Sequence, residues 1–332
     1  MARGGIPAAP LPQRHGVDAM RLRMPQEGPW LTLRDHLVAR IPALGPERID
    51  AMLAAGEFVG IDGMPCASDA PFVPRSVVWV HRDLPDEVLV PFEVEVLHRD
   101  ERIVVVDKPP FLATMPRGMH VRETVVTRLR EQLGLPRLTP AHRLDRLTGG
   151  VLLLTTEQRW RGAYQQLFAR AEVHKEYLAV ARLDPSVTLP QQVAVHIDKP
   201  HGQWQARIDP DREPNAVTEI ELLRRCTGPD GIPVGLYRLI PHTGRTHQLR
   251  VTMSWLGLPM VGDPLYPVVH DVADDDFSTP LGLLAHILAF RDPIDGAPRR
   301  FVSRRLPGGW PAAEPAAEPA AEPVAEPVAE RA

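Results

Sequence analysis

The segment from Pro140 to Gly150 combines one carboxylate, several basic side chains and a pair of glycines, and it leads into an apolar run. Asp145 lies between Arg143 and Arg146, whose positive charges favour the ionised carboxylate. Adjacent glycines permit backbone conformations that other residues avoid, so we expect a sharp turn into a buried strand. Catalytic groups are commonly carried by loops at the edge of a rigid element. Considered alone, however, an aspartate flanked by arginines is more often part of a structural ion pair.

Two further residues, Tyr177 and Arg250, are of types that could take part in binding or catalysis. Tyr177 lies in a segment of strand-like composition, where its ring could stack on a planar group and its hydroxyl could take part in proton transfer. Arg250 lies in a helical pattern, on a different face from Leu249 and Met253, so we expect it to point toward a cleft. In isolation, a strand Tyr is more often half buried, and a helical Arg is usually solvated.

Asp145 also stands in one of a series of motifs that resembles the signatures of the RluA-type pseudouridine synthases. The segment HRLDRLTGG at 142–150 is similar to the family's HRLDxxTSG motif, in which the Asp is essential. Further similar segments occur in the family's order: Asp107-Lys108-Pro109, His174-Lys175-Glu176-Tyr177, Thr243–Arg250, Gly262–Tyr266 and Leu284–Phe290. The resemblance covers about residues 96–305, and a chance match of five motifs in series is not plausible.

The resemblance implies an isomerase that converts uridine in RNA to pseudouridine, with Asp145 as the catalytic carboxylate. The reaction breaks the N1–C1′ bond, turns the base and rejoins it through C5, which calls for a carboxylate as nucleophile or as support for a cationic sugar. The target base must leave the helical stack, and Arg143 matches the family residue that helps to hold this extruded state. Tyr177 matches the active-site Tyr, and Arg250 matches the Arg that pairs with the catalytic Asp. The chemistry needs no cofactor and no metal.

Two positions depart from the family pattern: Leu147 stands where an acidic residue is common, and Gly149 where Ser or Ala is common. Loss of an acid removes a like charge near Asp145, whereas Gly149 allows a looser turn. Because Asp145, Tyr177 and Arg250 are all present, we expect an active enzyme. The departures bear on RNA specificity more than on activity.

The elements that must position these residues are predicted to form an α+β catalytic domain over residues 91–306, with a mixed, mostly antiparallel sheet and interspersed helices. Helical patterns cover Thr124 to Leu133, the segment that begins at Glu157, and the segment around Arg250. Strand-like composition or alternation marks 93–100, 102–108, 151–156, 175–183, 192–198 and 218–226.

Residues 29–90 are predicted to form a small α/β module ahead of the catalytic domain. Leu33 and Leu37 begin a helical spacing, a second helix passes through 49–53, and Asp62-Gly63 is a hairpin turn signal. Two short helices followed by a hairpin resemble an S4-type RNA-binding module. Such helices are equally typical of plain core elements.

Both ends of the chain differ in composition from the rest. We expect residues 1–28 to be a disordered leader, without the apolar segment of a secretory signal. Residues 307–332 are expected to be a disordered Pro/Ala/Glu tail, because a Pro in every four-residue repeat prevents a regular helix. Five glutamates and one arginine beyond Trp310 account for the whole formal net charge of −4. The remainder is formally neutral, so net charge decides nothing about a nucleic-acid partner.

The expected setting follows from composition. Cys66 and Cys226 are too far apart, in contexts too unlike, to form a disulfide framework or a metal knuckle, and a reducing cytoplasm is the simplest compartment. The chain lacks a run of about 18 apolar residues, so we expect no membrane span. The expected partner is structured RNA, either ribosomal or transfer RNA, bound by a monomer.

Three alternatives remain open at this point. A non-catalytic S4-type RNA-binding protein would use the N-terminal module and the basic loop without forming a product. A metal-dependent hydrolase would need ligands such as His142 with Asp145, or the cluster 274–276, which is more typical of a solvated loop. A glycosidase with paired carboxylates lacks a convincing second acid, because strand alternation places Glu176 on the face opposite Tyr177.

Overall fold

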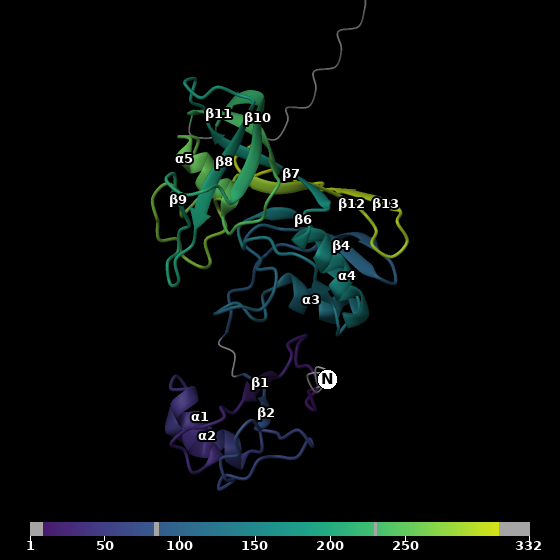
Figure 1. Cartoon of the computed structure of the whole chain (residues 1–332), viewed down its shortest axis with the longest axis vertical. Helices are drawn as coiled ribbons and strands as arrows, with labels where there is room; N and C mark the ends of the chain where they lie inside the picture. The colour runs from purple at the N-terminus through teal and green to yellow at the C-terminus, as the bar shows by residue number, and fades with distance from the viewer. Residues whose placement is uncertain (1–8, 83–85, 229–230, 312–332) are drawn as a thin grey trace, which may run out of the picture. The chain divides into compact units, whose positions relative to one another are not determined.

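The structure, a computed structural model, describes residues 9–82, 86–228 and 231–311 (Figure 1). The chain divides into two compact units, and each is considered by itself. Unit 1 comprises Met1–Lys175, Val272–Ser278 and Ala285–Ser303, and unit 2 comprises Glu176–Asp271, Thr279–Leu284 and Arg304–Ala332.

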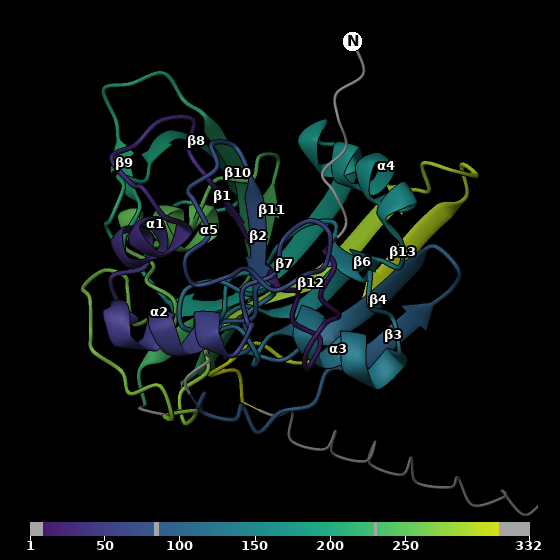
Figure 2. The ribbon, with the colours of Figure 1, turned by 90° about the horizontal axis from the view of Figure 1, so that it is seen from below.

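The first part of unit 1 contains two helices and a two-stranded antiparallel sheet: β1 (Met20–Arg23), α1 (Leu33–Arg40), α2 (Gly45–Ala54) and β2 (Val77–Val80). Thr32 caps α1 in a capping box with Asp35. The two helices lie side by side (Figure 2), and their buried residues share one core with Phe58 and both strands. The predicted turn at Asp62-Gly63 is present: Gly63 has a φ of 81°, and Gly60 N donates to Met64 O at 2.9 Å.

The structure differs from the leader predicted over residues 1–28. Residues 1–8 lie outside the described part of the chain, but β1 pairs antiparallel with β2, and Leu22 and Met24 are buried. Arg130 also donates to Gly16 O at 3.0 Å and to Asp18 at 2.9 Å. The segment MRLRM alternates apolar and basic residues, as a half-buried strand does, but it is short and pairs with a segment far along the chain, so the prediction overlooked it.

The second part of unit 1 is a mainly antiparallel sheet with two helices. Its strands are β3 (Glu95–Arg99), β4 (Ile103–Lys108), β5 (Thr139–Pro140), β6 (Gly149–Thr155), β12 (Leu283–Arg291) and β13 (Pro298–Val302). Its helices are α3 (Val125–Leu133) and α4 (Gln158–Ala169). Tyr164 and Leu167 of α4 share a core with Val151 and Leu153 of β6. Every residue of β4 and β6 is buried, as expected for near-continuous apolar runs.

Unit 2 is built on an antiparallel sheet in the order β7-β11-β10-β8-β9. The strands are β7 (Val173–Arg182), β8 (Gln191–Asp198), β9 (Arg207–Asp209), β10 (Ala216–Thr227) and β11 (Pro233–Pro241). In β8 the buried Val193, Val195 and Ile197 alternate with more exposed neighbours. The helix α5 (Gln248–Trp255) contacts β8, β9 and β11 on one face of this sheet (Figure 1).

The predicted α+β class with a mostly antiparallel sheet is confirmed. Residues 91–306 contribute to both units, with the boundary inside β7 and β12. The modules predicted at 29–90 and 91–306 stay predictions. Of the predicted tail 307–332, residues 312–332 lie outside the described part, and 307–311 contain no helix or strand. None of the described helices is long and apolar enough to cross a membrane.

Candidate active site

Asp145 lies in the loop that joins β5 to β6 within unit 1. The chain before the loop runs beside β6, because Ala141 N donates to Leu153 O at 2.9 Å. The loop closes in a turn in which Thr148 N donates to Asp145 O at 3.1 Å. At its end, Gly150 has a φ of 109°, and a Cβ there would lie 2.2 Å from Ala285 O. Glycine is therefore required where the loop enters the sheet, as the sequence predicted for this residue.

Lys108, the last residue of β4, binds the backbone of this loop through its side chain. The side chain is fully buried, and its Nζ donates to Pro109 O at 2.9 Å, Leu112 O at 2.6 Å and Arg146 O at 3.0 Å. A buried ammonium is stable only when its donors are satisfied, and these carbonyls accept from it. The contact to Arg146 fixes the backbone directly after Asp145.

Thr114 and His142 hold the other side of the loop. Thr114 Oγ1 accepts from Leu144 N at 3.1 Å and donates to Leu144 O at 2.7 Å, so both backbone groups before Asp145 are satisfied. His142 Nε2 accepts from Leu153 N at 3.1 Å, and its ring stacks on Phe168 with centroids 4.4 Å apart.

His142 is a neutral structural group rather than a metal ligand. Burial, and secondarily the charge of Lys175, lower the pKa of His142 to about 3. Its Nε2 lone pair is already used by a backbone amide. In the part of the chain that the structure describes, no group of three or more His, Cys, Asp or Glu side chains could hold a metal ion.

The two predicted site residues of this loop differ in exposure. The Asp145 residue is partly exposed, and Arg143 is exposed. A partly exposed carboxylate on a loop whose backbone is fixed from both sides is suited to reach a substrate without reorganising. Arg143, free of burial, is suited to contact a phosphate backbone.

Arg250 lies in unit 2 and is buried. Its guanidinium donates through Nε to Asp263 Oδ2 at 2.8 Å and through Nη2 to Asp263 Oδ1 at 2.5 Å, and it lies 5.4 Å from the centroid of the Tyr266 ring. The helix predicted around Arg250 is present as α5. The sequence analysis expected Arg250 to point toward a cleft, and the bidentate pair with Asp263 is a contact that it did not predict. The fork geometry of Arg, which Lys cannot reproduce, explains the residue type.

Hydrogen bonds extend from this pair through the rest of the motif. Asp263 Oδ1 also accepts from Leu265 N at 2.9 Å and Tyr266 N at 3.2 Å, and the Tyr266 hydroxyl lies 3.0 Å from His247 Nδ1. The buried Gln248 Nε2 donates to Thr218 Oγ1 at 3.0 Å, which joins α5 to β10. The motif around Arg250 is thus a fixed polar network.

Tyr177 is half buried in β7, opposite Leu239 of β11. Asp145 and Arg143 belong to unit 1, whereas Tyr177 and Arg250 belong to unit 2. Each is described within its own unit, and their assembly into one site, including the pairing of Arg250 with Asp145, stays a prediction.

Sequence reasoning missed several residues that position the site. Lys108 and Asp263 were both quoted as parts of motifs, yet the contacts they make were not foreseen. Thr114 carried no signal at all, because nothing local distinguishes a buried hydroxyl that serves a loop thirty residues later. For Lys108 a signal existed: lysine occurs only three times in the chain, at 108, 175 and 199.

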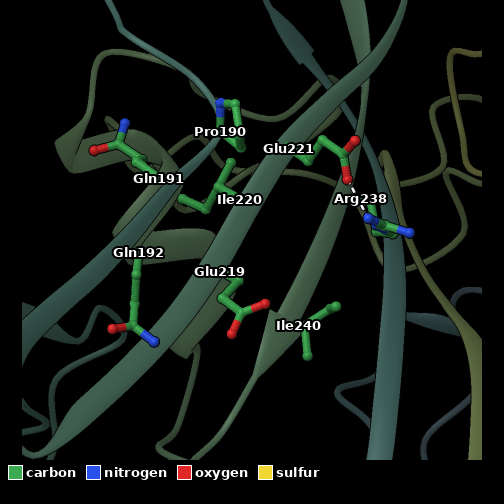
Figure 3. Close-up of a pocket in the computed structure, with 8 residues that line it drawn as sticks. All are labelled: Pro190, Gln191, Gln192, Glu219, Ile220, Glu221, Arg238 and Ile240. Atoms are coloured by element: carbon green, nitrogen blue, oxygen red, sulfur yellow. Dashed lines mark hydrogen bonds and ion pairs between the residues drawn. The ribbon is translucent and has the colours of Figure 1, made fainter.

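A separate pocket of about 480 Å³ lies on the face of β8, β10 and β11 in unit 2 (Figure 3). It contains none of the predicted site residues. Glu219 and Glu221 line it, and Glu221 pairs with Arg238. Its carboxylates make it unsuited to bind a phosphate backbone, so we assign no substrate to it.

Comparison with known proteins accords with the motifs. The family described as RNA pseudouridylate synthase matches residues 102–255. The tRNA pseudouridine synthase C of Haemophilus influenzae is 33% identical over 190 residues, covering 53% of this chain and 77% of that protein. The dual-specificity RNA pseudouridine synthase RluA of Vibrio parahaemolyticus is 32% identical over 205 residues, covering 60% and 78%. Human RNA pseudouridylate synthase domain containing 1 superposes with a TM-score of 0.52 at 25% identity, covering 64% of this chain and 84% of that one.

Fold, motifs and relatives together define an RNA-modifying isomerase. The chain belongs to the RluA-type family of RNA pseudouridine synthases. The non-catalytic alternative is therefore not favoured.

Proposed function

We propose that the protein isomerises uridine in ribosomal or transfer RNA, with Asp145 as the catalytic nucleophile. The observation that carries the proposal is the support of the Asp145 loop: Lys108 and Thr114 bind the backbone on either side of it, and the side chain stays partly exposed. A reactive group held this way is preorganised for its substrate. Similar proteins are named for transfer RNA, for dual specificity and, in Xanthomonas campestris, for the large ribosomal subunit.

In the proposed reaction the N1–C1′ bond breaks, C5 bonds to C1′, and a proton leaves C5 while N1 gains one. Asp145 either bonds to the sugar or assists the proton abstraction. Arg143 would hold the RNA with the target base extruded, and Tyr177 would stack on that base. Arg250 would pair with Asp145, fix its carboxylate and keep it charged.

The setting forms part of the same proposal. Residues 29–90 would act as an S4-like RNA-binding module ahead of a catalytic domain at 91–306. Both cysteines are unbridged, which supports a reducing, cytoplasmic compartment. We propose a monomer that binds structured RNA.

The test is the isosteric substitution Asp145→Asn, with Asp275→Asn in the acidic loop as the matched control. Turnover of RNA from cells that lack the gene should fall by at least about 10⁴-fold in Asp145→Asn and stay near wild type in the control. Pseudouridine mapping in total RNA from cells with and without the gene identifies the uridine that the protein modifies. Retained turnover in Asp145→Asn would show that another group is the nucleophile.

A further inference from the structure

Trp204 is a large apolar side chain in an unusual place. It is 77% exposed, in the loop that joins β8 to β9 in unit 2 (Figure 1). Tryptophan is normally largely buried, and a solvated indole gains nothing from the hydrophobic effect. Tryptophan is also enriched at the surfaces through which proteins bind their partners.

The loop that carries Trp204 is held in a defined conformation. Lys199 Nζ donates to Trp204 O at 2.6 Å and also to Gln203 O, which closes the loop across its base. The backbone under the indole is therefore tied to the end of β8. Preorganisation of an exposed aromatic residue lowers the entropic cost of binding through it.

The same loop is tied to the motif network around Arg250. Ala206 N donates to the Tyr266 hydroxyl at 2.6 Å, and Gln205 Nε2 donates to Pro267 O at 3.2 Å and to Leu265 O. Tyr266 N in turn donates to Asp263, the partner of Arg250. Trp204 thus stands one residue from a segment that binds directly to the Asp263–Tyr266 loop.

We infer that Trp204 stacks on an unpaired base of the RNA substrate. The inference rests on the proposed function, because it adds a contact for the same substrate. Structured RNA presents unpaired bases in its loops and bulges, and an indole offers such a base a flat apolar surface. Such stacking tolerates any base, so Trp204 contributes affinity rather than reading sequence.

Binding is measured in the Asp145→Asn background, so that it is separate from turnover. The probes are unmodified transcripts of large-subunit ribosomal RNA and of transfer RNA. Trp204→Ala and Trp204→Leu should weaken binding of the transcript that the wild-type enzyme isomerises about 10-fold, whereas Trp204→Phe keeps a ring and should stay within about threefold. Trp255→Ala removes another half-exposed indole of unit 2 and should leave binding unchanged.

Turnover separates this contact from a structural role. In the otherwise wild-type enzyme, Trp204→Ala should raise KM about 10-fold with kcat within twofold, and 5-iodouridine in an unpaired segment of the substrate should crosslink to Trp204. Equal affinity of Trp204→Ala and the parent would overturn the inference, even if Asp145→Asn is inactive. A change in oligomeric state without a change in RNA affinity would assign Trp204 to a protein contact and overturn it as well.

Discussion

The Asp145 loop of unit 1 and the Arg250 network of unit 2 show different kinds of support around their central charges. Asp145 is a partly exposed residue, and Lys108 and Thr114 fix the backbone on either side of it. Arg250 is buried, and its own guanidinium is fixed by Asp263. The backbone around the proposed nucleophile is thus fixed by hydrogen bonds, whereas the Arg250 guanidinium is itself fixed by an ion pair.

The contrast has an energetic consequence. Contacts to the backbone of a loop can be lost singly, each at the cost of an unsatisfied carbonyl or amide. Loss of one partner from a buried ion pair leaves a whole charge without compensation. Substitutions in the Arg250 network should therefore cost the most stability, and those around the Asp145 loop should cost less but affect turnover more directly.

The largest stability effect is expected for Arg250→Ala, which leaves the Asp263 carboxylate buried without its cation. The free energy of unfolding should fall by about 3–5 kcal/mol in denaturant titrations. The double substitution Arg250→Met with Asp263→Leu should recover part of this loss. Arg34→Ala, which removes an exposed pair with Asp50, is the control and should barely move the midpoint. Equal losses of unfolding free energy in Arg250→Ala and Arg34→Ala would show that the buried pair contributes no more stability than the exposed one.

Lys108→Met comes next. It withdraws the donor from two buried carbonyls and one partly buried carbonyl, and the free energy of unfolding should fall by about 2–3 kcal/mol. Because the Arg146 carbonyl is among them, the Asp145 loop loosens, and kcat at saturating RNA should fall about 100-fold. Loss of stability with unchanged kcat would show that Lys108 does not position Asp145.

Thr114→Val should have a smaller effect. The amide and carbonyl of Leu144 lose their shared partner, at a cost of about 1–2 kcal/mol in unfolding free energy. Thr114→Ser retains the hydroxyl and serves as the matched variant, in which most of the stability and turnover should return. If Ser and Val behave alike, the lost methyl packing, not the hydrogen bonds, is the cause.

The smallest effect concerns pH and His142. Its native pKa of about 3 lies below the ordinary value of 6.5, so the unfolded chain binds the proton first as the pH falls. The stability that the neutral His142 contributes is complete above pH 6.5 and is lost between pH 6.5 and about 3. Between pH 7 and 6 the wild type should lose roughly 0.5–1 kcal/mol more unfolding free energy than His142→Gln. Parallel pH profiles would show that His142 titrates in the native state.

Local patterns predicted the elements well where they were complete. Thr124 caps α3, Gly134 ends it with a φ of 64°, and the apolar runs at β4 and β6 are fully buried strands. Prediction failed for the leader, where β1 exists only through its pairing with β2. For Arg250 the sequence did not indicate the ion pair with Asp263, and the predicted pairing with Asp145 stays a prediction.

The sequence by itself determined the reaction class, the α+β architecture and the nomination of Asp145, because motifs and periodicity are properties of neighbouring residues. Only the tertiary structure decided what holds that residue and what surrounds Arg250. Lys108 reaches Arg146 across 38 positions, and Gln205 reaches Leu265 across 60. Such contacts depend on strand pairing and burial that bring distant segments together, and no local pattern encodes them.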